Sequence, residues 1–313
     1  MGPPGGPFDN AAQSLSLSNS GTSTLQWSLV NTSVWLNASP SGGTLTPGAT
    51  ASVKVSLNAA AGVLGTGVFS TDLLFSNLTS GVTQSRQFTV RVGQSLVQNG
   101  GFETGDFAGW TFSGNSADNF ASSSSAVVHS GAYGAAVGEV SLPLGALSQT
   151  LPTVAGQPYL LSCWLDSSSP GGRRPQTTPN QFKVIWNGVT LFNRTNIAVI
   201  GWTNIHFVVG ATAASTVLQF GFRDDPWFLG LDDVSVVPVP VPALQSVLQT
   251  NGRLDFAWLG MTGLRYQTQY RTNLTQGAWA NLGGIITATN STLTTSDTIG
   301  PDRQRFYRVV LLP

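Results

Sequence analysis

Apolar and polar side chains alternate with a period of two in short runs along the whole chain. Residues 53–57, 88–92 and 254–258 are clear examples, because their first, third and fifth side chains are all large and apolar. This spacing gives a strand one buried face and one face toward solvent. Gly, Pro, Asn and Ser interrupt the runs, and apolar residues at helical spacing are nearly absent. The pattern therefore predicts an all-β chain built from β-sandwiches.

The length of 313 residues suits two or three domains of ordinary size. The runs group into three predicted sandwiches, over residues 1–93, 95–237 and 243–313. Proline alternates with valine at 237–242, and alternating prolines favour an extended polyproline rod over a central strand. We therefore predict a semi-rigid linker over residues 238–242. We also expect the first two domains to be closely coupled, because hardly any residues separate them.

Two tryptophan-containing runs mark the first predicted domain. They are LQWS at 25–28 and VWL at 34–36, and SPSG follows at 39–42. Together with an LSNSG turn, this order resembles bacterial extracellular immunoglobulin-like repeats, including those called BACON-like. The resemblance implies an Ig-like sandwich, and such domains often act as spacers beside sugar-binding modules. We expect Trp27 and Trp35 in its core, because large aromatic side chains dominate cores.

Two motifs delimit the second predicted domain. They are LVQNGGFETG at 96–105 and LDDVSV at 231–236. The pair resembles the ends of the galactose-binding-like jelly roll, as in carbohydrate-binding modules of families four and nine. The runs at 130–135 and 147–151 stand where that family has matching strands. The resemblance implies a jelly-roll sandwich, and it is more specific for the fold than for a ligand.

The third predicted domain has three alternating runs, at 254–258, 266–270 and 305–310. Its short length and strand pattern resemble the small fibronectin-type-III-like domains at the C-termini of large bacterial exported proteins. The resemblance implies a third sandwich, which fits this length only if its loops are short.

Carboxylates stand in both motifs of the second domain. In the jelly rolls that it resembles, a structural calcium ion often bridges the glutamate of the opening motif and an aspartate of the closing one. Here these residues are Glu103 and Asp232 or Asp233. Asp232 is in register with Val234 and Val236, so the spacing places it on the apolar side of its strand. A buried carboxylate needs a partner, and either Ca²⁺ or backbone N–H donors would serve.

Three predicted strands of the second domain carry polar or aromatic side chains opposite an apolar face. Sugar rings stack on tryptophan while Asn, Gln, Arg and His bond to hydroxyls, so this combination suits a glycan cleft. The predicted carbohydrate-binding residues are Trp164, Trp202, Asn204, His206, Gln219, Arg223 and Trp227. The alternative is a packing face against another domain or another copy. Lys183 and Trp186 fall on opposite faces of their strand, so only one of them can join either role.

The charge balance limits the classes of partner that the protein can bind. Fourteen Lys and Arg balance fourteen Asp and Glu, and charged residues make up only 9% of the chain. A neutral, charge-poor chain lacks the basic face that nucleic-acid binding needs, and without a long apolar run we expect no membrane insertion. The composition is rich in Gly, Pro, Ser and Thr, which is typical of exported β proteins. We therefore expect an extracellular or cell-surface location.

Catalytic motifs are missing from the sequence. There is no nucleophile elbow, no metalloprotease helix motif and no P-loop, and the chain has only two histidines, His129 and His206. We therefore predict that the protein is not an enzyme. The single cysteine, Cys163, falls on the apolar face of its strand and should be an inert core thiol.

Two functions remain open. One is a non-enzymatic binding protein whose middle domain holds a polysaccharide or cell-surface glycan. The other is a structural subunit of an extracellular filament, sheath or surface layer, whose partners are other copies of itself. Sandwich edges can accept a neighbour's strand, and the Pro/Gly-rich arm at residues 1–13 is a candidate connector.

Overall fold

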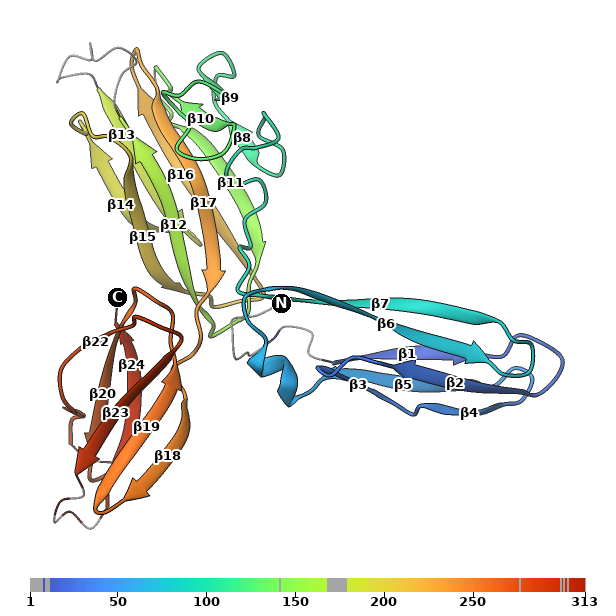
Figure 1. Ribbon diagram of the computed structural model, residues 1–313. Coiled ribbons are helices and arrows are strands. Elements are labelled where there is room, and N and C mark those ends of the chain that lie inside the picture. The colour runs from blue at the N-terminus through green and yellow to red at the C-terminus, as the bar shows by residue number, and fades with distance from the viewer. Residues whose placement is uncertain are drawn as a thin grey trace. The chain divides into compact units, whose positions relative to one another are not determined.

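The computed structural model describes residues 8, 12–140, 142–167, 179–275, 277–298, 300, 302 and 304–312. Their regular structure is antiparallel strands and one short 3₁₀ helix, Ala59–Val63, which confirms the all-β prediction (Figure 1). Among these residues, no helix has the length and apolar character that crossing a membrane requires. Contacts divide the chain into two compact units, Ser95–Val239 and a second unit that contains residues 1–94 and 240–312. Within that second unit, the strands before residue 95 and those after residue 240 form separate sheets.

The strands of residues 12–92 form a sandwich of two sheets. The three-stranded sheet has the order β1 (Ala12–Ser18), β5 (Thr50–Leu57), β3 (Leu36–Ser39). The four-stranded sheet has the order β4 (Gly42–Leu45), β2 (Leu25–Asn31), β6 (Gly67–Asn77), β7 (Thr83–Val92). Trp27 and Trp35 are buried in one cluster with Val53 and Leu73, as the sequence predicted.

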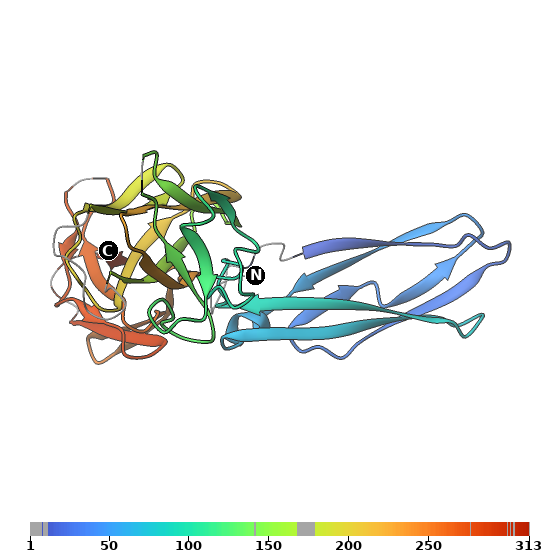
Figure 2. The same ribbon diagram turned by 90° about the horizontal axis from the view of Figure 1, so that it is seen from above.

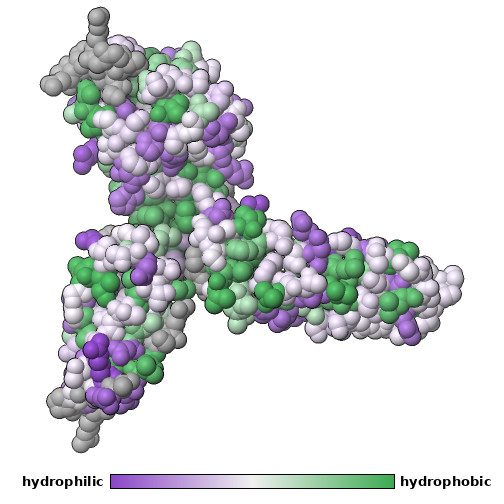
Figure 3. Space-filling model, viewed as in Figure 1, coloured by the Kyte–Doolittle hydropathy of each residue, from purple (hydrophilic) through white to green (hydrophobic). Residues whose placement is uncertain are grey.

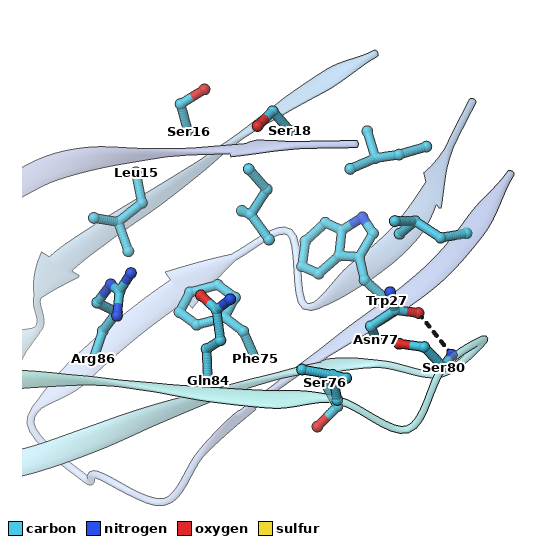
Figure 4. A pocket seen from close by; sticks show the side chains of 14 residues that line it. Leu15, Ser16, Ser18, Trp27, Phe75, Ser76, Asn77, Ser80, Gln84 and Arg86 are labelled. Atoms are coloured by element: carbon cyan, nitrogen blue, oxygen red, sulfur yellow. Dashed lines mark hydrogen bonds between the residues drawn. The ribbon is translucent and has the colours of Figure 1, made fainter. Parts of the chain in front are cut away.

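This first sandwich is open along one side. Within the described residues, β1 pairs only with β5 and β7 only with β6, so each presents a free edge. The two strands follow separate rims of the sandwich (Figure 2). Between them lies a hollow of about 490 Å³ whose lining includes Leu15, Leu17, Trp27, Phe75 and Arg86 (Figure 4). Other exposed hydrophobic side chains lie scattered over the face of this sandwich shown in Figure 3.

The strands of residues 111–238 form a larger sandwich of two five-stranded sheets, which we call the middle sandwich. One sheet has the order β15 (Thr203–Gly210), β12 (Pro158–Asp166), β17 (Leu229–Pro238), β10 (Gly134–Val137), β9 (Asn119–Ser122). The other has the order β14 (Val189–Thr195), β13 (Asn180–Trp186), β16 (Ser215–Asp224), β11 (Gly145–Pro152), β8 (Thr111–Ser113). Tyr159 and Trp186 meet between the sheets, with ring centroids 6.3 Å apart. The two outer faces therefore point away from each other across a common core.

The stretch predicted as a linker begins inside this sandwich. Pro238 is the last residue of β17 and is level with Tyr159 of β12. The Val239 N–H then donates to the Pro158 carbonyl at 2.9 Å, and its side chain is buried. Proline is tolerated at this position because β10, on the other side of β17, pairs only with residues 229–231.

The strands of residues 244–312 form two further sheets, which together we call the C-terminal sandwich. One has the order β18 (Leu244–Thr250), β19 (Arg253–Leu259), β23 (Thr292–Thr298). In the other, β20 (Arg265–Arg271) pairs on one side with β21 (Ala280–Asn281) and β22 (Ile286–Thr287), and also with β24 (Phe306–Leu312). Phe256 and Trp258 are buried here, which accounts for the alternation seen in β19, and Tyr266 of β20 is buried as well.

Candidate carbohydrate-binding site

The residues predicted to bind carbohydrate fall on opposite sides of the middle sandwich. Trp164 lies on β12, Trp202 directly precedes β15, and Asn204 and His206 lie on β15. Gln219 and Arg223 lie on β16, in the other sheet, and Trp227 lies in the loop between β16 and β17. Because the core separates the sheets, one cleft cannot contain both groups. We call the outer face of β12 and β15 the aromatic face, and the outer face of β13 and β16 the polar face.

Strand alternation explains why these side chains point outward. On β16, Leu218, Phe220 and Phe222 are fully buried, whereas Gln219 and Arg223 between and beside them are half-buried. On β12, Leu161 and Cys163 face the core and Trp164 faces out. Burial raises the pKa of the Cys163 thiol to about 12, so at neutral pH it stays protonated, in line with an inert core thiol.

The aromatic face is covered by the chain's own side chains. The imidazole of His129 stacks on the indole of Trp164, with centroids 3.9 Å apart and an interplanar angle of 17°. Trp202 meets the same imidazole edge-on at 5.3 Å. A sugar ring would need a free indole face, and this stack occupies one face of Trp164.

The polar groups beside this stack also bond to one another. The Asn204 amide donates to the Ser162 hydroxyl at 2.8 Å. Its carbonyl oxygen lies 2.9 Å from His206 Nδ1. Asn204 and His206 therefore use part of their hydrogen-bonding capacity within the face.

Two carboxylates, the exposed Glu103 and the buried Asp232, hold the segment that carries His129. Both oxygens of Glu103 accept from the Ala132 N–H, at 3.1 and 3.0 Å. Asp232 Oδ2 accepts from the N–H groups of His129 and Ser130, at 2.8 and 3.2 Å. Burial raises the pKa of the Asp232 carboxyl, while these N–H groups act in the opposite direction.

Asp233 adds side-chain contacts to the same segment. Its Oδ1 accepts from the Ser130 hydroxyl at 2.8 Å, and its Oδ2 lies 2.6 Å from His129 Nδ1. Asp232 Oδ1 accepts from the Asp233 N–H at 2.7 Å. We call Glu103, Asp232 and Asp233 the acidic cluster.

The donor set of the acidic cluster does not fit a calcium ion. Ca²⁺ takes six to eight oxygen ligands. Each carboxylate oxygen of the cluster already faces a hydrogen-bond donor or an imidazole nitrogen. Within the described ranges, no group of three or more His, Cys, Asp or Glu side chains is arranged to hold a metal. These hydrogen bonds match the alternative, in which the carboxylates accept from backbone N–H groups. Calcium binding at this cluster stays an untested prediction.

The expected orientation of Asp232 was wrong, although its side chain is fully buried. In the pairing of β12 with β17, Asp232 lies opposite the outward-facing Trp164, and Leu231 lies opposite the core residue Leu165. Asp232 therefore points to the aromatic face and is buried there beneath the His129 segment. The reason is a β-bulge at Asp233, whose φ is 48°. The bulge adds one residue to β17, so Asp232 faces the opposite side from the one that alternation with Val234 and Val236 predicts.

The polar face places long polar side chains around a glycine. Gly221 of β16 has no side chain, and Lys183 of β13 is level with it. Arg223 is level with Gln181, and Gln219 is level with Ser148 on the opposite side. Gly221 itself is buried, and a Cβ there would contact Leu144 and Lys183. The polar surface at this point is therefore formed by the long side chains on either side of the glycine.

Several hydrogen-bond donors on the polar face lack partners. Arg223 Nε is buried without an acceptor. Arg223 Nη2 lies 3.5 Å from the Val140 carbonyl and 3.9 Å from Asp225 Oδ2, which are long, weak contacts. Within the part of the chain described, the side chains of Lys183 and Gln219 have no hydrogen-bond or ion-pair partner. Buried unpaired donors are rare in folded proteins, so Arg223 requires an explanation.

The sequence did not indicate that Gln181 belongs to the polar face or that His129 covers Trp164 on the aromatic face. Alternation along 180–186 did separate Lys183 from the buried Trp186. The pairing of β13 with β16 joins residues about forty positions apart, and no local pattern indicates it. Similarly, His129 reaches Asp232 from about a hundred positions away.

Comparison with known protein families supports the resemblance stated for the first domain. The family model described as "Viral BACON domain" matches residues 7–87, which confirms the BACON-like character of the first sandwich. No curated protein matches the chain.

Solved structures similar to the chain include carbohydrate-binding modules. A CBM61 module in complex with β-1,4-galactotriose, TmCBM61, shows 20% identity and a TM-score of 0.34, covering 46% of this chain and 97% of that one. The CBM22-1 xylan-binding domain from Paenibacillus barcinonensis Xyn10C shows 16% identity and a TM-score of 0.33, covering 48% and 97%. The enzymatically active domain of a bacteriophage CBA120 tailspike protein shows 12% identity and a TM-score of 0.34, covering 46% and 21%. Similarity at this level does not indicate a ligand for this chain.

Proposed function

We propose that this protein is a non-catalytic, exported glycan-binding protein, and that the polar face of its middle sandwich holds the polysaccharide. The observation that carries the proposal is a group of half-buried side chains, Lys183, Gln219 and Arg223, whose terminal donors are unpaired or only weakly paired in the described part of the chain. A ligand rich in hydroxyl oxygens would supply the missing acceptors.

The order of side chains on the polar face supports an extended chain of sugars. Gln181, Lys183 and Arg223 lie on neighbouring positions of β13 and β16, and Ser148 and Gln219 continue the polar surface to β11. Amide, ammonium and guanidinium groups in this order can bond to successive hydroxyls. The aromatic face is less suited, because His129 covers Trp164.

Affinity electrophoresis tests this proposal. The full chain is run in gels that contain a panel of soluble neutral polysaccharides, beside the double variant Gln181→Ala/Arg223→Ala. We expect at least one polysaccharide to retard the parent protein and to lose most of that effect on the variant. Arg91→Gln, on β7 of the first sandwich, is the matched control. Equal retardation of the parent and the double variant would contradict the proposal.

The open side of the first sandwich favours a second candidate function, that of a self-assembling structural subunit. Free edges of β1 and β7 flank a hollow lined by both apolar and polar side chains, and a strand from another copy could pair there and fill it. Most of the arm at residues 1–13 that could supply such a strand lies outside the described residues.

Negative-stain microscopy distinguishes this candidate. If strand exchange occurs, the parent protein forms regular polymers, whereas Leu15→Glu/Leu17→Glu remains a folded monomer because the charges line the hollow. Deleting residues 1–13 should also abolish polymers if that arm is the connector. Dispersed parent molecules, or polymers that persist in the Leu15/Leu17 variant, would exclude this function.

A further inference from the structure

The C-terminal sandwich carries two arginines that meet one tryptophan. The guanidinium of Arg271, at the end of β20, lies 4.6 Å from the ring centroid of Trp279. The guanidinium of Arg308, on β24, lies 4.3 Å from the same centroid. Cation–π contacts at these distances fix both guanidinium groups and bring two positive charges together.

Neither arginine has a carboxylate partner in the described part of the chain. Residues 240–313 contain six arginines but only three acidic residues, Asp255, Asp297 and Asp302. Asp255 pairs with Arg253 at 2.9 Å. Asp297 and Asp302 both pair with Arg305, at 2.6 Å.

Arg271 also has a donor without an acceptor. Its Nε is buried and makes no hydrogen bond, while one terminal nitrogen donates to the Leu274 carbonyl. A guanidinium without a carboxylate partner keeps its positive charge uncompensated, so an anion beside its terminal nitrogens would stabilise this arrangement. The local charge therefore points to an anionic ligand.

A row of amides continues from the arginines across three strands. Arg308 Nε donates to Gln269 Oε1 at 2.9 Å. The Gln269 amide in turn donates to Asn281 Oδ1 at 2.9 Å. This orients the Arg308 guanidinium and places amide groups beside it, where they can bond to neutral hydroxyls.

We propose that Arg271, Trp279, Arg308, Gln269 and Asn281 form a second binding site, for an acidic polysaccharide whose sugars carry carboxylates. Guanidinium groups bind planar carboxylates through paired N–H donors, and the amides suit the hydroxyls between them. A nucleic-acid site would use a free aromatic face for base stacking, but both guanidinium groups already lie against Trp279. The site is independent of the polar face of the middle sandwich.

Affinity electrophoresis of the full chain in gels with polygalacturonate tests the proposal. The neutral comparison is the same polymer with its carboxylates methyl-esterified. We expect retardation by the acid form only. Arg271→Gln and Arg308→Gln should each weaken binding about tenfold, the usual size for a lost hydrogen bond to a charged group. Arg253→Gln, on the same sandwich, is the control that keeps full binding.

Thermal unfolding of each variant shows whether it is folded, and Arg308→Gln keeps the test valid if loss of Arg271 disturbs the Leu274 loop. Three results would overturn the proposal. One is the absence of retardation by polygalacturonate. The second is equal retardation of the Arg271→Gln/Arg308→Gln double variant. The third is equally strong binding to double-stranded DNA, which would indicate a general polyanion surface.

Discussion

The two outer faces of the middle sandwich carry similar sets of side chains but use them differently. On the aromatic face, Trp164 stacks with His129, and Asn204 bonds to Ser162 and His206. On the polar face, the donors of Arg223 and Lys183 are unpaired or only weakly paired. The difference teaches that an outward tryptophan is not by itself a sugar platform. Unsatisfied hydrogen-bonding capacity is the better guide to a binding surface.

The largest expected effect is on stability, from a substitution on the aromatic face that should leave polysaccharide binding unchanged. Trp164→Ala removes the stack with His129 and uncovers the side of Asp232 that faces it. We expect the free energy of unfolding to fall by about 3 kcal/mol, near the low end for loss of a large aromatic side chain. Denaturant titration measures this change. The folded fraction should still bind polysaccharide with unchanged affinity, and a stable variant that no longer binds would reverse the roles of the two faces.

A smaller effect should come from the acidic cluster. A Cβ on Gly131 would lie 2.0 Å from Glu103 Oε1, and the residue has a φ of 72°. We expect Gly131→Ala to cost about 2 kcal/mol of stability, from strain together with displacement of the carboxylate. Gly156→Ala is the matched control, because its φ is 82° and nothing lies within 4 Å of the added atom. Equal losses in the two variants would mean that the contact with Glu103 contributes nothing.

Gln219→Ala tests the polar face directly. Gln219 is half-buried, and its side chain has no hydrogen-bond partner in the described part of the chain. We expect stability to change by less than about 0.5 kcal/mol. Polysaccharide affinity should fall about fivefold, which corresponds to about 1 kcal/mol, because a hydrogen bond to the ligand is lost. Unchanged affinity in isothermal titration would place the ligand elsewhere.

Calcium removal should have the smallest effect. The acidic cluster already meets hydrogen-bond donors, so we expect a chelator to leave the melting temperature of the full chain unchanged. Differential scanning calorimetry with added calcium and with chelator measures this. A clear fall in the melting temperature with chelator would instead support the calcium hypothesis for Glu103, Asp232 and Asp233.

Local features of the fold were predictable from the sequence, because a period of two determines which side chains face a core. Cys163 was assigned to the buried face of its strand on that basis, and Trp27 was expected in a core as a large aromatic side chain; both are buried. The orientation of Asp232 was not predictable, because a single bulge residue reverses the period. The split of the predicted sugar-binding residues depends on which strands share a sheet. Contacts between distant segments determine that arrangement, and alternation within one strand carries no information about it.

Lysine acetylation footprinting tests the central claim most directly. The chain has two lysines, Lys183 on the polar face and the exposed Lys54 on β5 of the first sandwich. The full chain is acetylated with and without a saturating polysaccharide identified by electrophoresis, and both sites are quantified by mass spectrometry. If the glycan lies on the polar face, acetylation of Lys183 slows severalfold while that of Lys54 is unchanged. Equal acetylation of Lys183 in the free and saturated protein would contradict this account.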